Sequence, residues 1–350
     1  GQEVVPDSGC GSWLWEPQST NLITQSELFS DASWVKSGSS ITSNAVISPD
    51  GNVNAAKLIA SATNSEHRIS ASISTSATES ISIFAKKDGY DFLIFRLSTS
   101  TNGFNNACFD LDNGQLGTIG SNYSNAKIED FGNGWYRCSF VVTNRSGLNI
   151  NVLAAEQDNV QSFLGDGTSG VYIWGAQIEA LSYATSYIPT EGSTVTRNQD
   201  LCTNGGSLAS INSTEGVLYA EIAALANDLS FRSIGLSDGT VNNRILILYT
   251  DASNGIRVLV FRNNLLQVIL NHTINITDVN KVAVRYKFND VSFWANGTKL
   301  STDTNAFMPI GLNELSFSRG DGNLPFFGKT KALAVFPYLT DAELTELTTI

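Results

Sequence analysis

Short segments in which polar and apolar residues alternate run through almost the whole sequence. SISIF at 80–84 and NINVL at 149–153 alternate as a β-strand does when one of its faces is buried. Turn signals such as PDG at 49–51, KDG at 87–89 and DNG at 112–114 separate these segments. Many short strands without an intervening helical period predict an all-β fold made of antiparallel β-sandwiches.

The first half contains eight expected strands, at 54–62, 67–74, 79–86, 91–98, 105–112, 134–143, 148–155 and 170–179. The second half contains nine, at 216–225, 231–237, 243–250, 255–262, 265–272, 280–288, 290–296, 313–318 and 330–336. Thr340 and Glu343 have the spacing of a capping box, which predicts a short helix at the end of the chain.

The length of 350 residues favours two domains, because a single core of this size is uncommon. The strand pattern breaks at IPTEGST, residues 188–194. We therefore expect an extended lead-in at 1–30 packed on the first domain, a jelly-roll sandwich at 31–188, a linker at 189–204 and a second sandwich at 205–350.

Charge and composition exclude several classes of function. The net charge is −12, and the first 200 residues carry twice as many acidic as basic side chains, which disfavours binding to nucleic acid. No apolar run is long enough for a membrane span, so we expect no membrane insertion. Targeting cannot be read from a sequence that begins at Gly1.

Four cysteines lie far apart, without a CxxC pair, and only two histidines are present. We therefore expect no zinc site and no cofactor. Cys108 and Cys138 lie in expected strands and are interpreted as buried free thiols. Whether Cys10 and Cys202 form a disulfide that flanks the first domain stays open.

Several phrases resemble known modules of tailed-phage fibre and virion proteins. The start and end of the first half resemble a carbohydrate-binding jelly roll, through LWEPQSTNLITQSE (14–27), SWVKSG (33–38), SPDG (48–51), GWYRC (134–138), VYIWGAQIE (171–179) and SYIPT (186–190). The second half is similar to concanavalin A-like, laminin G-type lectin domains, through LSDGT (236–240), KVAVRYK (281–287), KALAVF (331–336) and LTDAEL (339–344).

The resemblance implies a non-catalytic adhesin that binds a glycan or receptor on the surface of a phage-like particle, outside the cell. The implied partners are a cell-surface or extracellular glycan and other virion subunits. We expect a homo-oligomer, because several copies strengthen weak single sites. Two alternatives stay open: a capsid or tail decoration protein with mainly structural contacts, and a glycan-degrading enzyme or its binding appendage.

Sugar binding on a sandwich uses an exposed aromatic ring and planar polar side chains. In the first half, Trp34 lies in a polar loop, and Arg68, Arg96 and Arg137 lie in expected strands, where together they would line a concave face. In the second half the candidates crowd one turn, namely Asp238, Asn243 and Arg244, with Tyr249 close behind. The alternatives are core packing for the aromatic residues and scattered ion pairs for the arginines.

Calcium is the one metal for which the sequence offers ligands. Asp238 in its turn, Asp110 with Asp112, and Asp166 supply hard oxygen atoms, although Asp-Gly turns are common without a metal.

Motifs of catalysis are missing from the sequence. The closely spaced Glu-x-Asp-x-x-Glu pattern of laminarinase-like sandwich enzymes does not occur, and Glu221 is an isolated strand residue. His67 and His272 fall in different domains without an evident partner. We therefore expect that the protein is not an enzyme.

Overall fold

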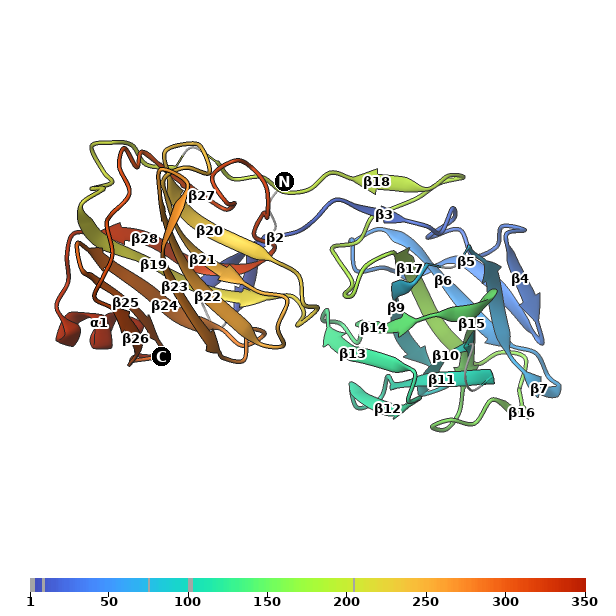
Figure 1. Ribbon diagram of the computed structural model, residues 1–350. Helices are drawn as coiled ribbons and strands as arrows, with labels where there is room; N and C mark the ends of the chain where they lie inside the picture. Colours follow the sequence, from blue (N-terminus) through green and yellow to red (C-terminus); the bar gives the residue numbers. More distant parts are fainter. Residues whose placement is uncertain (1–3, 8–9, 75, 100–102, 204) are drawn as a thin grey trace. The chain divides into compact units, whose positions relative to one another are not determined.

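The structure, a computed structural model, describes residues 4–7, 10–74, 76–99, 103–203 and 205–350. It is built almost entirely from antiparallel strands, with one short helix (Figure 1). Two compact units divide the chain. We call Gln18–Asn198 the first sandwich, and Gly1–Pro17 together with Gln199–Ile350 the second sandwich. The expected all-β fold class is confirmed.

The first sandwich consists of two six-stranded sheets, which we call the front and back sheets. The front sheet has the order β12 (Gln115–Ile119), β11 (Gly103–Asp110), β10 (Phe92–Thr99), β15 (Arg145–Ala155), β8 (Arg68–Ser72), β4 (Trp34–Ser37). The back sheet has the order β13 (Tyr123–Asp130), β14 (Tyr136–Thr143), β9 (Thr78–Asp88), β17 (Gly170–Glu179), β6 (Val53–Ala60), β5 (Ser39–Ile47). Two small pairs complete the unit: β7 (Asn64–Glu66) with β16 (Ser162–Leu164), and β3 (Ser19–Asn21) with β18 (Val195–Arg197).

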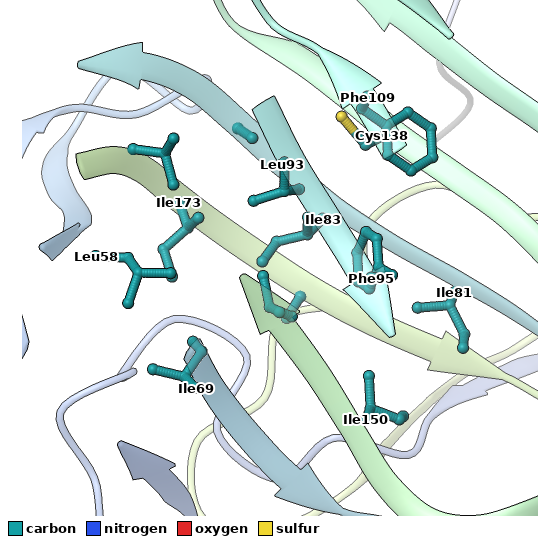
Figure 2. Close-up of a cluster of buried hydrophobic side chains, with 14 of the residues drawn as sticks. Leu58, Ile69, Ile81, Ile83, Leu93, Phe95, Phe109, Cys138, Ile150 and Ile173 are labelled. Carbon is teal, nitrogen blue, oxygen red and sulfur yellow. The ribbon is translucent and has the colours of Figure 1, made fainter. Parts of the chain in front are cut away.

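Alternate residues of the two sheets meet in one core. Ile81 and Ile83 of β9 face Leu93 and Phe95 of β10 across the sandwich, and all four are essentially inaccessible to solvent (Figure 2). The period of two read from the sequence thus selects the buried face of each strand.

A buried ion pair joins the two sheets. Arg145 of β15 donates from Nε to Glu79 Oε2 (2.7 Å) and from Nη2 to Glu79 Oε1 (3.1 Å), and both side chains are fully buried. The same guanidinium also donates to the main-chain oxygens of Gly147 and Ile73, at 2.5 and 3.2 Å. Each of its three nitrogen atoms therefore has an acceptor in the core.

The second sandwich pairs a seven-stranded sheet with a five-stranded sheet around its own core. The seven-stranded sheet has the order β1 (Val4–Asp7), β2 (Cys10–Trp15), β28 (Gly328–Phe336), β19 (Glu215–Ala224), β24 (Asn280–Lys287), β25 (Asp290–Ala295), β26 (Thr298–Asp303). The five-stranded sheet has the order β23 (Leu265–Thr273), β22 (Gly255–Arg262), β21 (Arg244–Tyr249), β20 (Arg232–Ser237), β27 (Glu314–Ser316).

Helix α1 (Asp341–Thr348) covers the outer face of the seven-stranded sheet, where Leu344 packs with Tyr219 and Trp294. The predicted capping box is present, with the Thr340 hydroxyl accepting from the Glu343 main-chain nitrogen.

The start of the chain corrects the expected lead-in. Strands β1 and β2 belong to the second sandwich, because β2 pairs with both β1 and β28. Trp15 is 4% exposed and stacks on Phe317, with ring centroids 4.5 Å apart. The free energy gained by burying the Trp15 indole in the second core is larger than any advantage of packing on the first sandwich, which follows directly in the sequence. The two units divide at residues 198 and 199.

Three of the four cysteines can be compared with expectation. Cys108 and Cys138 are buried free thiols, as expected, and burial raises the pKa of Cys108 to about 12. Cys202 is also a free thiol, whereas the side chain of Cys10 lies outside the described part of the chain. None of the described helical segments is both long and apolar enough to span a membrane.

Removing the Trp15 side chain should destabilise the second sandwich alone. Trp15→Ala creates a cavity in that core, so we expect a loss of about 3–5 kcal/mol in its free energy of unfolding. The matched control is Trp13→Ala in the same strand, whose side chain is 46% exposed and whose loss should stay near 0.5 kcal/mol. Denaturant unfolding followed separately for the two units measures both. An equal loss of unfolding free energy in the two variants would contradict the assignment of Trp15 to the core of the second sandwich.

Breaking the buried ion pair should destabilise the first sandwich. Arg145→Met leaves the Glu79 carboxylate in the core without its cation, so we expect a loss of about 3–5 kcal/mol. Lys87→Ala removes an ion pair with Asp112 in which both side chains are close to half exposed, and should cost at most about 1 kcal/mol. The double variant Arg145→Met/Glu79→Leu should recover most of the loss in urea unfolding. If the double variant does not recover stability, the loss in Arg145→Met comes from altered packing and not from the unpaired Glu79 carboxylate.

Candidate functional site

The outward face of the front sheet carries a cluster of polar side chains. We call Glu66, Arg68, Arg96, Asn151 and Gln161 the polar cluster. Its members come from β7, β8, β10, β15 and the segment before β16, so segments far apart in the sequence build it.

Strand parity places the central members. In β10, Phe95 and Leu97 lie in the core, so Arg96 between them points to the opposite face. Asn151 also lies between two core residues of its strand. The register makes Arg96 and Asn151 direct neighbours across β10 and β15. The next strand pairs Asn151 with Ser70, two residues from Arg68 on the same face.

Hydrogen bonds connect the cluster into one network. The Glu66 carboxylate accepts from Arg96 Nη1 and lies 3.3 Å from Arg68 Nε. Arg68 Nη1 donates to Asn151 Oδ1. Asn151 Nδ2 donates to the main-chain oxygen of Arg96 at 2.9 Å, and Arg96 Nη1 donates to Gln161 Oε1 at 2.9 Å.

The network is partly open to solvent. The side chains of Arg96, Glu66 and Arg68 are 15%, 27% and 29% exposed. Ion pairs at such positions contribute about 0–1 kcal/mol to stability, so their main effect is to orient the guanidinium planes. The polar cluster itself contains two cations and one carboxylate.

A segment between β15 and β16 covers the neighbouring part of the same face. Asp158 accepts from the Thr118 main-chain nitrogen (2.9 Å) and hydroxyl (2.7 Å), and Asn106 donates to Asn159 at 2.6 Å. Ile94, Cys108, Leu153 and Ala155 form a small buried cluster on this face. The polar cluster thus adjoins a covered, rigid part of the sheet.

Arg137 does not join the other two predicted arginines. It lies on β14 of the back sheet and is 7% exposed. Its Nη2 donates to Ser82 Oγ at 3.1 Å and to the main-chain oxygen of Thr185 at 2.6 Å. The expected three-arginine face is therefore wrong for Arg137, which fastens residue 185 to the back sheet.

The prediction that Trp34 and Tyr249 bind a ligand is also wrong, because both side chains are only 1% exposed. Trp34 begins β4 on the core side, and its Nε1 donates to the main-chain oxygen of Gln25 at 2.8 Å. Tyr249 has the same parity as the core residues Ile245 and Ile247 of β21. Neither ring can stack against a sugar at the surface.

The other second-sandwich candidates meet at one end of the five-stranded sheet. Asn243 Nδ2 donates to Asp238 Oδ2 at 2.9 Å, and Asn243 Oδ1 accepts from the main-chain nitrogens of Asn263 (3.2 Å) and Ile310 (3.3 Å). Arg244 follows directly and is 7% exposed. Three of the four predicted residues are therefore neighbours.

The aspartates considered for calcium accept hydrogen bonds within their own turns. Asp238 accepts from Thr240, Asp110 from residues 112 and 113, and Asp166 from Thr168 and Ser169. In the described part of the chain, no group of three or more His, Cys, Asp or Glu side chains converges in a way that could hold a metal.

The histidines are occupied in structural contacts. Both ring nitrogens of His67 lie against main-chain oxygens, Gly38 O at 2.5 Å and Phe163 O at 3.1 Å. His272 Nε2 lies 2.7 Å from Ser301 Oγ, and burial lowers the pKa of its ring.

Sequence reasoning missed three members of the polar cluster, and it missed Phe261, whose ring centre lies 3.7 Å from the guanidinium carbon of Arg244. Asn151 carried a visible signal, since it occupies an outward position in the alternating segment at 149–153. Glu66 and Gln161 carried none, because only the pairing of β7 with β16, which lie far apart in the sequence, brings them together. Phe261 lies opposite Arg244 on the next strand, a register that the sequence pattern alone does not fix.

Comparison with solved structures gives distant likenesses, among them a trans-sialidase and a pair of laminin domains. No protein-family model and no curated protein matches the sequence. The leech intramolecular trans-sialidase, solved with 2,7-anhydro-Neu5Ac, is 21% identical over 39% of this chain and 24% of its own, with a TM-score of 0.34. Domains LG4-5 of the mouse laminin alpha1 chain are 9% identical over 81% of this chain and 88% of their own, with a TM-score of 0.28. This chain thus spans about a quarter of the leech protein, and both scores are too low to inform function.

The Asp238 turn should make stability depend on pH. Burial raises the pKa of Asp238, but hydrogen bonds from Thr240 and Asn243 outweigh it and hold the pKa below the ordinary 3.8. Its stabilising effect is therefore present above pH 3.8 and lost as the pH falls further. Thermal unfolding should show a gap between the native protein and Asp238→Asn at neutral pH that narrows in acid. A gap of constant size would contradict this.

Proposed function

We propose that this protein is a non-catalytic glycan-binding protein that acts outside the cell, with the polar cluster of the front sheet as its primary site. The observation that carries the proposal is that Glu66 holds the guanidinium groups of Arg68 and Arg96 side by side on an outward sheet face.

The chemistry of the cluster suits neighbouring sugar hydroxyls. A guanidinium plane donates two parallel hydrogen bonds, which matches the spacing of adjacent hydroxyl oxygens. The Glu66 carboxylate and the Gln161 amide oxygen can accept from the same hydroxyls. Because Asn151 and Glu66 already fix both arginines, binding costs little side-chain entropy.

The finer proposal is an adhesin on a phage-like particle, such as a tail fibre or another virion surface protein. Its support is the resemblance of both halves of the sequence to modules of such proteins. Single sites on a sheet face bind weakly, so a homo-oligomer that presents several copies would supply the necessary avidity.

A second candidate function is a decoration protein whose second sandwich contacts other virion subunits. Exposed apolar side chains favour it. Phe288 and Phe307 are 56% and 53% exposed with ring centroids 5.4 Å apart, and Leu265 and Leu266 of β23 are exposed as well. Exposed apolar patches of this kind commonly mark contacts between proteins.

Glycan-array binding by the full chain, followed by titration of the best glycan, tests the primary site. Arg96→Ala should weaken binding at least tenfold, or about 1.4 kcal/mol, because it removes charge-assisted hydrogen bonds. Arg96→Lys should retain only part of the affinity, since an ammonium group lacks the planar fork.

The control is Lys127→Ala, which removes an exposed cation from β13 of the back sheet and should leave affinity unchanged. Binding that survives both Arg96→Ala and Arg68→Ala would place the glycan elsewhere. Silence on arrays and on host cells, together with assembly onto virion subunits, would favour the decoration protein. Release of oligosaccharide from a polysaccharide would refute the non-catalytic assignment.

A further inference from the structure

Arg244 occupies an unusual position at the start of β21. Its register partners are Ser237 of β20 and Phe261 of β22, and its guanidinium carbon lies 3.7 Å from the centre of the Phe261 ring. It points away from the core, because the next residue, Ile245, lies in the core. Nevertheless Arg244 is 93% buried, since its exposed fraction is 7%.

Two nitrogen atoms of the Arg244 guanidinium lack an acceptor in the described part of the chain. Its Nε and Nη1 atoms are buried and have no hydrogen-bond partner among the described residues. Three other buried arginines bind carboxylates, as Arg145 binds Glu79, Arg232 binds Asp228 and Arg285 binds Asp341. The buried Arg137 donates to Ser82 and to the main-chain oxygen of Thr185. A buried cation without an acceptor loses its hydration without compensation, which is costly unless something else supplies the acceptor.

The nearby carboxylates are engaged elsewhere. Asp238 accepts from Thr240 and Asn243, as described above. Asp321 accepts from Arg319 Nη2 at 2.5 Å and Nε at 3.2 Å. Burial lowers the pKa of Arg244, and the positive charge of Arg319 lowers it further, against the opposing effect of Asp321 and Asp238. The protonated guanidinium would therefore be stabilised by one more anion.

Two loops lie beside Arg244 at one end of the five-stranded sheet. The segment around Gly320 lies against the β20–β21 hairpin, so close that a Cβ atom at Gly320 would lie 2.7 Å from Ser237 Cβ and 3.0 Å from Thr240 O. Gly239, Thr240 and Gly322 on these two loops are exposed. Arg244 therefore lies beside two solvent-facing loops rather than deep in the core.

We propose that Arg244 anchors a second binding site, which takes the carboxylate of an acidic sugar such as a uronic acid. The carboxylate would accept from the guanidinium, whose other face is covered by Phe261. The two aspartates beside the site disfavour doubly charged phosphate or sulfate groups and favour a single negative charge. Carboxylate binding stands on the geometry of Arg244 alone, whereas the sugar part rests on the proposed function.

The experiment follows the Nε–Hε resonance of Arg244 in nitrogen-15 NMR spectra of the full chain. Glucuronate and acetate should each shift this resonance saturably, whereas glucose at equal concentration and chloride at equal ionic strength should not. Arg244→Lys should weaken glucuronate binding at least tenfold. The matched control is Arg257→Lys on neighbouring β22, whose Nε already donates to Asn271 Oδ1 at 2.5 Å, and which should bind glucuronate normally.

Titration of the unaltered protein keeps the test valid even if Arg244→Lys fails to fold. No shift with either carboxylate, or a stronger response to inorganic phosphate or sulfate, would overturn the proposal. Arg96→Ala separates the two sites, because it should weaken glycan-array binding and leave the acetate response intact. If the protein binds no glycan on the array but the Arg244 resonance still responds to acetate, the proposed function is refuted and the carboxylate site is retained.

Discussion

The buried ion pair between Arg145 and Glu79 connects the two sheets of the first sandwich. Two of the five acceptor contacts of this guanidinium go to Glu79 of β9, so a slip between β9 and β15 would leave a buried charge unpaired. Strand β15 also carries Asn151, which orients Arg68 from the other face of the sheet. The geometry of the outer polar cluster is thus fixed in part by an interaction on the inside.

Strand prediction succeeded where one face of a strand is apolar and the other polar. The expected strands at 170–179 and 255–262 agree with β17 and β22 at both ends. Strand β5 was missed because it is polar and largely exposed, so it shows no alternation. Strand β2 was placed with the wrong unit because its partner, β28, lies more than 300 residues away in the sequence. Pairing over such a separation leaves no local signal.

Prediction of the site residues also depended on which face of its strand each residue occupies and on pairing between strands that lie far apart in the sequence. Arg68 and Arg96 were found because a charged residue between core residues must face outward. Trp34 was misjudged because no strand was expected around it, so its parity could not be read. Tyr249 lay in the expected strand at 243–250, where it shares the parity of Ile245 and Ile247, but its closeness to the turn was given more weight. Predicting Glu66 and Gln161 as site residues would have required the pairing of β7 with β16. Recognising that two nitrogen atoms of Arg244 lack an acceptor in the part of the chain that the structure describes would have required the positions of its neighbours in space.

The path of the chain makes the first sandwich an insertion within the second. Strands β1 and β2 precede the first sandwich in the sequence, but they belong to a sheet that is complete only when β28 has been synthesised. The two ends of the first sandwich lie together, because β3 at its start pairs with β18 at its end. Contacts within the first sandwich therefore compensate the loss of chain entropy that bringing these ends together requires. On the ribosome, the first sandwich would fold while β2 still waits for its partner, with Trp15 exposed in the interval.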